Sequence, residues 1–134
     1  MANINSAHTH IKVLAINPHD KTIQVIFLPA CYDGEDGYMV ITPSSAKDAM
    51  NTKQMLVHTR TTIGLLRVEL IGEDNSYGYL WPGITMGGAI FRGMLLIVKN
   101  KGVSLDDGEI EQLCEAIQWR GPVYRPLGIS AISI

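Results

Sequence analysis

The run MLLIV at residues 94–98 constrains the fold of this chain more than any other stretch of its sequence. Every side chain in the run is apolar, so a strand formed here has two hydrophobic faces. Such a strand is stable in the middle of a sheet that other elements cover on both sides. We therefore expect residues 94–98 to form the central strand of a layered domain.

The composition is typical of one globular domain. The chain has 134 residues, of which 46% are hydrophobic and 18% charged, as expected for a folded chain with a single core. Its net charge is −2 and its eleven Lys and Arg residues are scattered, which argues against binding to duplex nucleic acid. We find neither a secretory leader nor an apolar segment long enough to cross a membrane, so we expect a cytoplasmic protein.

Residues that commonly hold metals or form disulfides are few. Cys31 and Cys114 are far apart and form no CxxC pair, so we expect both to be reduced thiols. His8 and His10 share a face in an extended chain, but they lack the further ligands that a metal site needs. We expect no metal and no cofactor.

The first half of the chain reads as strands and one short helix. Residues 11–16 and 22–28 are β-prone runs on either side of the turn NPHDK, which predicts a hairpin. A short strand is expected at 38–42, and Thr42 is expected to cap a helix of about two turns. Residues 56–71 form a long β-prone segment that is bent or interrupted at Gly64 and continues through a turn into a second hairpin with 77–81.

The second half adds the long helix. Ser104 is expected to cap it and Gly121 with Pro122 to end it, and apolar residues recur along one stripe between them. The apolar tail at 127–134 is expected to be either a paired strand or a surface for a second copy of the chain. Together these patterns predict a tail at 1–10 and a single α+β domain at 11–134. Its antiparallel or mixed sheet has five to seven strands, with one long C-terminal helix and one short helix.

A glycine-rich stretch, WPGITMGGAIFRG at 81–93, raises the first site hypothesis. The lysine and hydroxyl of a phosphate-binding P-loop are missing, and a strand follows in place of a helix. Gly87 and Gly88 therefore favour a structural corner with positive φ. The alternative is a small-ligand or peptide pocket, in which Trp81, Tyr79 and Arg92 clasp a base or a phosphate beside the glycines.

A second hypothesis concerns His58, Arg60 and Thr62, which alternate along the segment 56–71. If the strand is unbroken, they share the core-facing side of Leu66 and its alternating neighbours, where polar groups are costly unless they line a cavity. If Gly64 changes the register, the trio lies in water. In the first case His58 can serve as an acid or base and Arg60 can hold an anion.

Three stretches carry a resemblance to a known group of proteins. They are a strand leading into a turn at 11–18, an apolar strand that begins with Gly93, and a helix start, VSLDDGEI, at 103–110. They resemble small uncharacterised α+β proteins of phages and mobile elements. The resemblance implies an accessory protein that binds a host protein or a small molecule, and it assigns no catalytic residue.

These observations favour a non-enzymatic binding protein that inhibits or sequesters a host protein or a small molecule and acts as a homo-oligomer. The absence of a nucleophile motif such as Gly-x-Ser-x-Gly supports this interpretation. One alternative is a small hydrolase or nucleotide-processing enzyme that uses His58 and Arg60. Another is a structural or assembly component of a phage particle.

Overall fold

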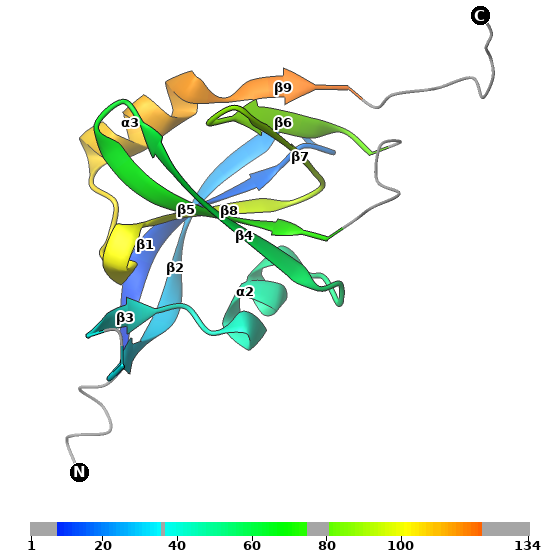
Figure 1. Ribbon diagram of the computed structural model, residues 1–134. Helices are drawn as coiled ribbons and strands as arrows, with labels where there is room; N and C mark the ends of the chain where they lie inside the picture. The colour runs from blue at the N-terminus through cyan, green and yellow to red at the C-terminus, as the bar shows by residue number, and fades with distance from the viewer. Residues whose placement is uncertain (1–7, 36, 75–80, 122–134) are drawn as a thin grey trace, which may run out of the picture.

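A computed structural model describes residues 8–35, 37–74 and 81–121 of the chain (Figure 1). In order, its elements are β1 (His8–Asn17), β2 (Thr22–Asp33), β3 (Tyr38–Val40), α2 (Pro43–Met50), β4 (Leu56–Ile63), β5 (Leu66–Glu73), β6 (Gly83–Met86), β7 (Ala89–Arg92), β8 (Leu95–Lys99), the 3-10 turn η2 (Asn100–Gly102), α3 (Asp107–Ala116) and β9 (Gln118–Arg120). Neither helix in these ranges has the length or apolar composition that a membrane span needs.

Six strands form one antiparallel sheet in the order β3-β2-β1-β8-β5-β4. As predicted, the apolar run at 94–98 supplies a central strand, because β8 lies between β1 and β5 and its first four residues are buried. The predicted hairpin of β1 and β2 is confirmed, and β1 begins at His8, three residues before its expected start. The α+β class is therefore confirmed.

The core has two layers because the central strands are buried on both faces. On one face, Leu14, Leu70 and Ile97 pack with residues of β6 and α3. On the other face, Val13, Ile71, Leu96 and their neighbours pack against α2. We call these the α3 layer and the α2 layer.

The prediction of a single sheet is wrong, since β7, β6 and β9 form a second, three-stranded sheet. Gly87 and Gly88 form the two-residue turn between β6 and β7, and both have positive φ, as a tight hairpin turn of this kind requires. The buried side chains of β6 pack in the α3 layer. The glycine-rich stretch thus forms a hairpin that covers one face of the large sheet, in the α3 layer.

The predicted long helix is shorter at both ends. Asp106, and not Ser104, is its N-cap, because Asp106 and Glu109 form a capping box. The Ser104 hydroxyl instead accepts a hydrogen bond from the Lys12 backbone N–H. At the other end, residues 118–120 leave the helix to pair with β6 as β9. The short helix α2 is capped by Thr42 as predicted.

Gly64 interrupts the long β-prone segment, as expected, and does so as a hairpin turn. β4 and β5 pair from Ile63 opposite Leu66 outward, leaving Gly64, with φ 64°, and Leu65 in the turn. β4 and β8 pair with the two edges of β5, and the predicted second hairpin between this segment and 77–81 stays a prediction. Residues 77–80 lie outside the described residues, as does the tail at 127–134.

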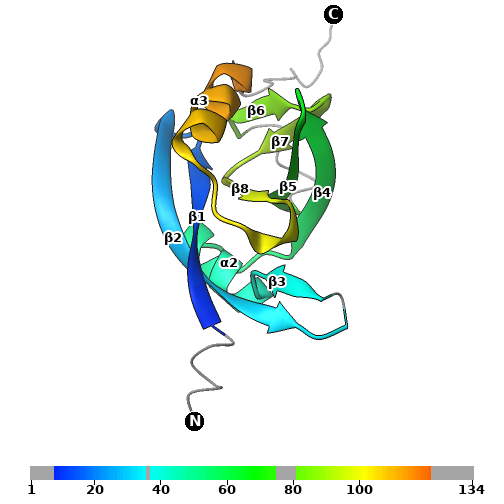
Figure 2. The same cartoon turned by 90° about the vertical axis from the view of Figure 1, so that its left-hand side faces the viewer.

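The large sheet is curled, so that its two end strands approach the same region. Figure 2 looks into the curl, with β2 on its left side, β4 on its right and α2 between them. β3 reaches η2, where the Met39 backbone lies so close to Gly102 that no side chain fits at that position. This close contact between β3 and η2 forms one border of the candidate site.

Candidate functional site

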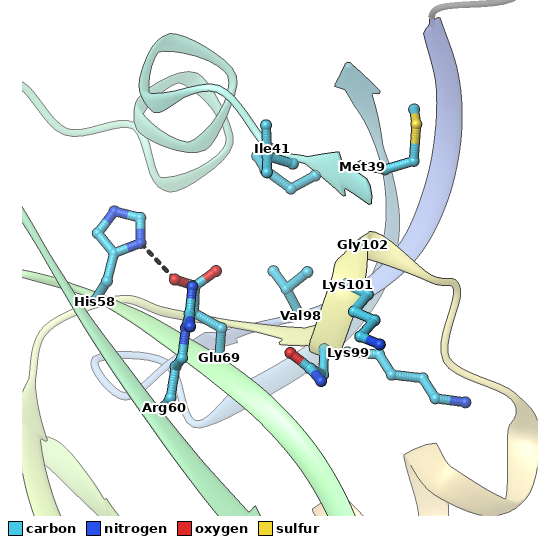
Figure 3. A pocket seen from close by; sticks show the side chains of 11 residues that line it. Met39, Ile41, His58, Arg60, Glu69, Val98, Lys99, Lys101 and Gly102 are labelled. Atoms are coloured by element: carbon cyan, nitrogen blue, oxygen red, sulfur yellow. Dashed lines mark hydrogen bonds and ion pairs between the residues drawn. The ribbon is translucent and has the colours of Figure 1, made fainter. Parts of the chain in front are cut away.

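A cleft of about 160 Å³ opens between β3, β4 and the end of β8 (Figure 3). We call it the β3–β4 cleft. It is lined by Met39, Val40, Ile41, His58, Arg60, Glu69, Val98, Lys99, Asn100, Lys101 and Gly102. Segments that lie far apart in the sequence, such as β3 and η2, therefore contribute to one site.

The sheet register builds the polar wall of the cleft. Arg60 on β4 lies opposite Glu69 on β5, which lies opposite Val98 on β8, so that these three side chains form a row on one face. His58 is two residues from Arg60 and shares its face. Figure 3 shows the Arg60 side chain beside Glu69.

His58 and Glu69 form a hydrogen-bonded pair in this wall. The Nδ1 atom of His58 is 3.0 Å from Oε2 of Glu69, and the pair is an ion pair when the imidazole is protonated. The two side chains are 41% and 30% exposed, so both are accessible to a ligand. A carboxylate bound at Nδ1 fixes the orientation of the imidazole and favours a proton on that nitrogen.

The opposite wall is apolar, and the rim carries lysines. Met39, Ile41 and Val98 supply the apolar lining, and Figure 3 shows Val98 between Ile41 and Glu69 and the Met39 side chain pointing away from the polar row. The Lys99 ammonium lies 2.7 Å from a Glu109 carboxylate oxygen on α3, so its charge is already matched. Lys101 is exposed in η2.

The structure decides between the two interpretations of His58, Arg60 and Thr62. The turn at Gly64 reverses the chain, so the trio shares a face with Glu69 and Ile71 and not with Leu66. All three are exposed, as the second interpretation expected. However, His58 and Arg60 line the β3–β4 cleft, whereas Thr62 lies opposite Arg67 and does not.

The residues of the glycine-loop hypothesis are only partly brought together. Arg92 donates from Nη1 to the carbonyl oxygens of Trp81, at 3.1 Å, and Gly121, at 2.8 Å. This end of the β6–β7 hairpin lies four residue pairs from the Gly87–Gly88 turn, which is roughly 13 Å along a strand. Gly87 packs against Thr61, and Tyr79 lies outside the described residues.

Sequence reasoning missed Glu69 and Lys101, although each leaves a signal. Glu69 is an acid at the centre of β5, LRVELIGE, directly between the apolar residues Val68 and Leu70. Lys101 is followed by glycine in a short turn, and its φ is 66°. The register of β4 and β5 places Glu69 beside His58, and the curl of the sheet brings η2 with Lys101 to the same cleft; no local pattern reveals either arrangement.

The described ranges contain no group of three or more His, Cys, Asp or Glu side chains that could hold a metal ion. His58 and Glu69 would supply only two ligands, fewer than a protein metal site usually has. Comparisons with protein-family models, curated proteins and solved structures give no match for this chain.

Proposed function

We propose that this chain is a small-molecule-binding protein whose ligand occupies the β3–β4 cleft. The observation that carries the proposal is the meeting of a polar wall, His58, Arg60 and Glu69, with an apolar wall across one cleft. Binding sites commonly combine an apolar lining with a few convergent polar groups in this way. Sequestration of a small molecule is the form of the function that the resemblance to accessory proteins implies.

Fragment screening by NMR tests this proposal on the full chain labelled with ¹⁵N. Fragments that bind are expected to shift the backbone amide signals of Met39, Ile41, Arg60 and Lys101, because these residues line the cleft. An Arg60→Ala variant should weaken such binding, and Thr62→Ala, on the same strand but outside the cleft, should not. Hits confined to Trp81 and Arg92 would contradict the proposal and favour the glycine loop.

A second candidate is a small hydrolase, which the 3.0 Å contact between His58 and Glu69 favours. A histidine oriented by a carboxylate can act as a general base, and Arg60 can stabilise a developing negative charge. The test is turnover of phosphomonoesters and cyclic nucleotides by the full chain. Turnover that is lost in His58→Gln and kept in Thr62→Ala would replace a purely binding function with an enzymatic one.

A further inference from the structure

The outer edge of β2 is open over most of its length. β3 pairs with β2 only from Cys31 to Asp33, and no other described strand lies against this edge. Figure 2 shows β2 at the left-hand border of the large sheet. Pro29 has no N–H group, so the segment of β2 that can accept a further strand is 22–28. Unpaired backbone groups along such an edge are a template for another strand.

The open segment is also apolar and uncharged. Its sequence, TIQVIFL, contains no charged residue. Ile23, Val25 and Phe27 share one face of β2 and are 36%, 46% and 59% exposed. The β1 residues opposite Ile23 and Val25 are buried in the α3 layer, so this row continues the core surface beyond the elements that cover it.

The open edge at the other end of the large sheet is different. β4 also lacks a further partner strand among the described residues, but it carries His58 and Arg60. Charged side chains are a common means by which proteins prevent unwanted pairing at an exposed edge. β2 has no charged residue at 22–28, which indicates that a strand of this protein occupies its edge.

We propose that the last eight residues of the same chain, LGISAISI at 127–134, pair with β2 at 22–28. This segment is uncharged, as the edge is, and four of its residues are Leu or Ile. Each of its two sets of alternate positions contains two of these four, so either face of the segment can cover the row on β2. The inference is independent of the function proposed for the β3–β4 cleft.

The place where the described chain ends favours this segment over a second copy of the chain. Arg92 donates from Nη1 to the carbonyl oxygens of both Gly121 and Trp81. The Trp81 ring in turn contacts His19, in the turn between β1 and β2, with the ring centroids 6.0 Å apart. Gly121 therefore lies near the turn from which β2 begins.

The length of the remaining chain fits the edge. Residues 122–126 can span up to about 18 Å when extended. The eight residues after them match the seven residues of 22–28 in length. Because Gly121 lies near the start of β2, the segment runs parallel to β2, and the outward N–H and C=O groups of 22–28 obtain partners.

Hydrogen exchange followed by NMR on the full chain tests this pairing. Every second amide of 22–28 points away from β1, and these amides should exchange at least about ten-fold more slowly than in an unstructured chain. A double variant, Ser130→Pro with Ala131→Pro, removes two neighbouring N–H groups and disrupts the pairing in either register. It should raise the exchange rate of these amides about ten-fold or more, while the amides of β8 stay protected and show that the domain is folded.

The matched control places two prolines near the other end of the chain. Asn3→Pro with Ile4→Pro should leave exchange at 22–28 unchanged. Fast exchange of the outward amides in the unmodified chain would overturn the proposal. Slow exchange that persists in the variant with Ser130→Pro and Ala131→Pro would overturn it as well.

Sedimentation at the concentrations used for NMR separates the other possible occupants of the edge. The proposal expects slow exchange at 22–28 where the chain sediments as a monomer. A dimer whose slow exchange persists in the variant with Ser130→Pro and Ala131→Pro would show that β2 of a second copy occupies the edge. Slow exchange that occurs only in a dimer and is lost in that variant would show pairing between chains, and would overturn pairing within one chain.

Discussion

At the scale of single residues, two neighbouring glycines have different reasons to be glycine. Gly87 and Gly88 both have positive φ, which strains any other L-residue. A Cβ atom on Gly87 would also lie 2.7 Å from the Thr61 hydroxyl oxygen on β4, whereas one on Gly88 would meet nothing within 4 Å. Gly87 therefore combines a conformational and a packing requirement, and Gly88 has only the first.

Substitution of each glycine by alanine separates the two requirements. Gly88→Ala should lower the free energy of unfolding by about 1 kcal/mol, the cost of a left-handed alanine. Gly87→Ala should lower it by about 2–4 kcal/mol, because overpacking against Thr61 adds to that cost. Urea unfolding measures both values. Thr61→Ala should recover part of the loss in Gly87→Ala, and equal losses in the two glycine variants would contradict this account.

The pKa of one thiol predicts its reactivity. Burial raises the pKa of Cys114, and the negative charge of Glu111 raises it further. Because the thiolate is the reactive form, iodoacetamide should modify Cys114 slowly at neutral pH and faster only as the pH rises above the usual range near 8.5. Glu111→Gln should lower this pKa and speed the reaction at a given pH, whereas Glu115→Gln, its control, should not. An unchanged rate in Glu111→Gln would contradict the second cause.

At the scale of elements, the start of α3 depends on a reciprocal pair. The Glu109 N–H donates to the Asp106 carboxylate at 2.8 Å, and the Asp106 N–H donates to the Glu109 carboxylate at 2.9 Å. The helix has only ten residues, so its ends contribute a large share of its stability. A capping box is the device that fixes where such a helix begins.

Removal of this cap should destabilise the protein measurably. Asp106→Ala should lower the free energy of unfolding by about 1 kcal/mol, the usual contribution of an N-cap side chain. Asp107→Ala is the matched control, because the Asp107 side chain is fully exposed and its 3.7 Å ion pair with Lys12 should contribute nothing measurable. Thermal unfolding of both variants checks the prediction, and an equal effect of the two would contradict it.

Local patterns predicted individual elements better than their pairing. The apolar run at 94–98 was sufficient to predict β8. In the same way, the turn after residue 16 predicted the first hairpin, and the Thr42 cap predicted α2. Gly64 signalled an interruption, but neither its form as a hairpin nor the partners of β5 follow from local sequence. Only part of the candidate site was predicted for the same reason, since sheet register places Glu69 beside His58 and Arg60, and the curl brings Lys101 to the same cleft.

At the scale of the whole molecule, the protein has a two-layered core, and the strand beside the cleft is held less firmly than the central strands. β1, β5 and β8 have buried residues on both faces, so their amides are covered by both layers. β3 is different, because it has three residues, pairs with the end of β2 and touches η2. Few contacts therefore hold the strand that forms the apolar wall of the cleft.

Native-state hydrogen exchange should reveal this difference. The amides of β8 should exchange only when the whole domain unfolds, whereas those of Met39 and Val40 should exchange through local opening at a lower free energy. A ligand that contacts both the apolar lining near β3 and Arg60 stabilises the state in which β3 is paired with β2. Binding favours the state that binds. A fragment that binds in the cleft should therefore slow exchange at residues 39 and 40 while leaving the three exposed residues of β9 unchanged. Equal slowing in β3 and β9 would indicate a general stabilisation of the fold and contradict binding at the cleft.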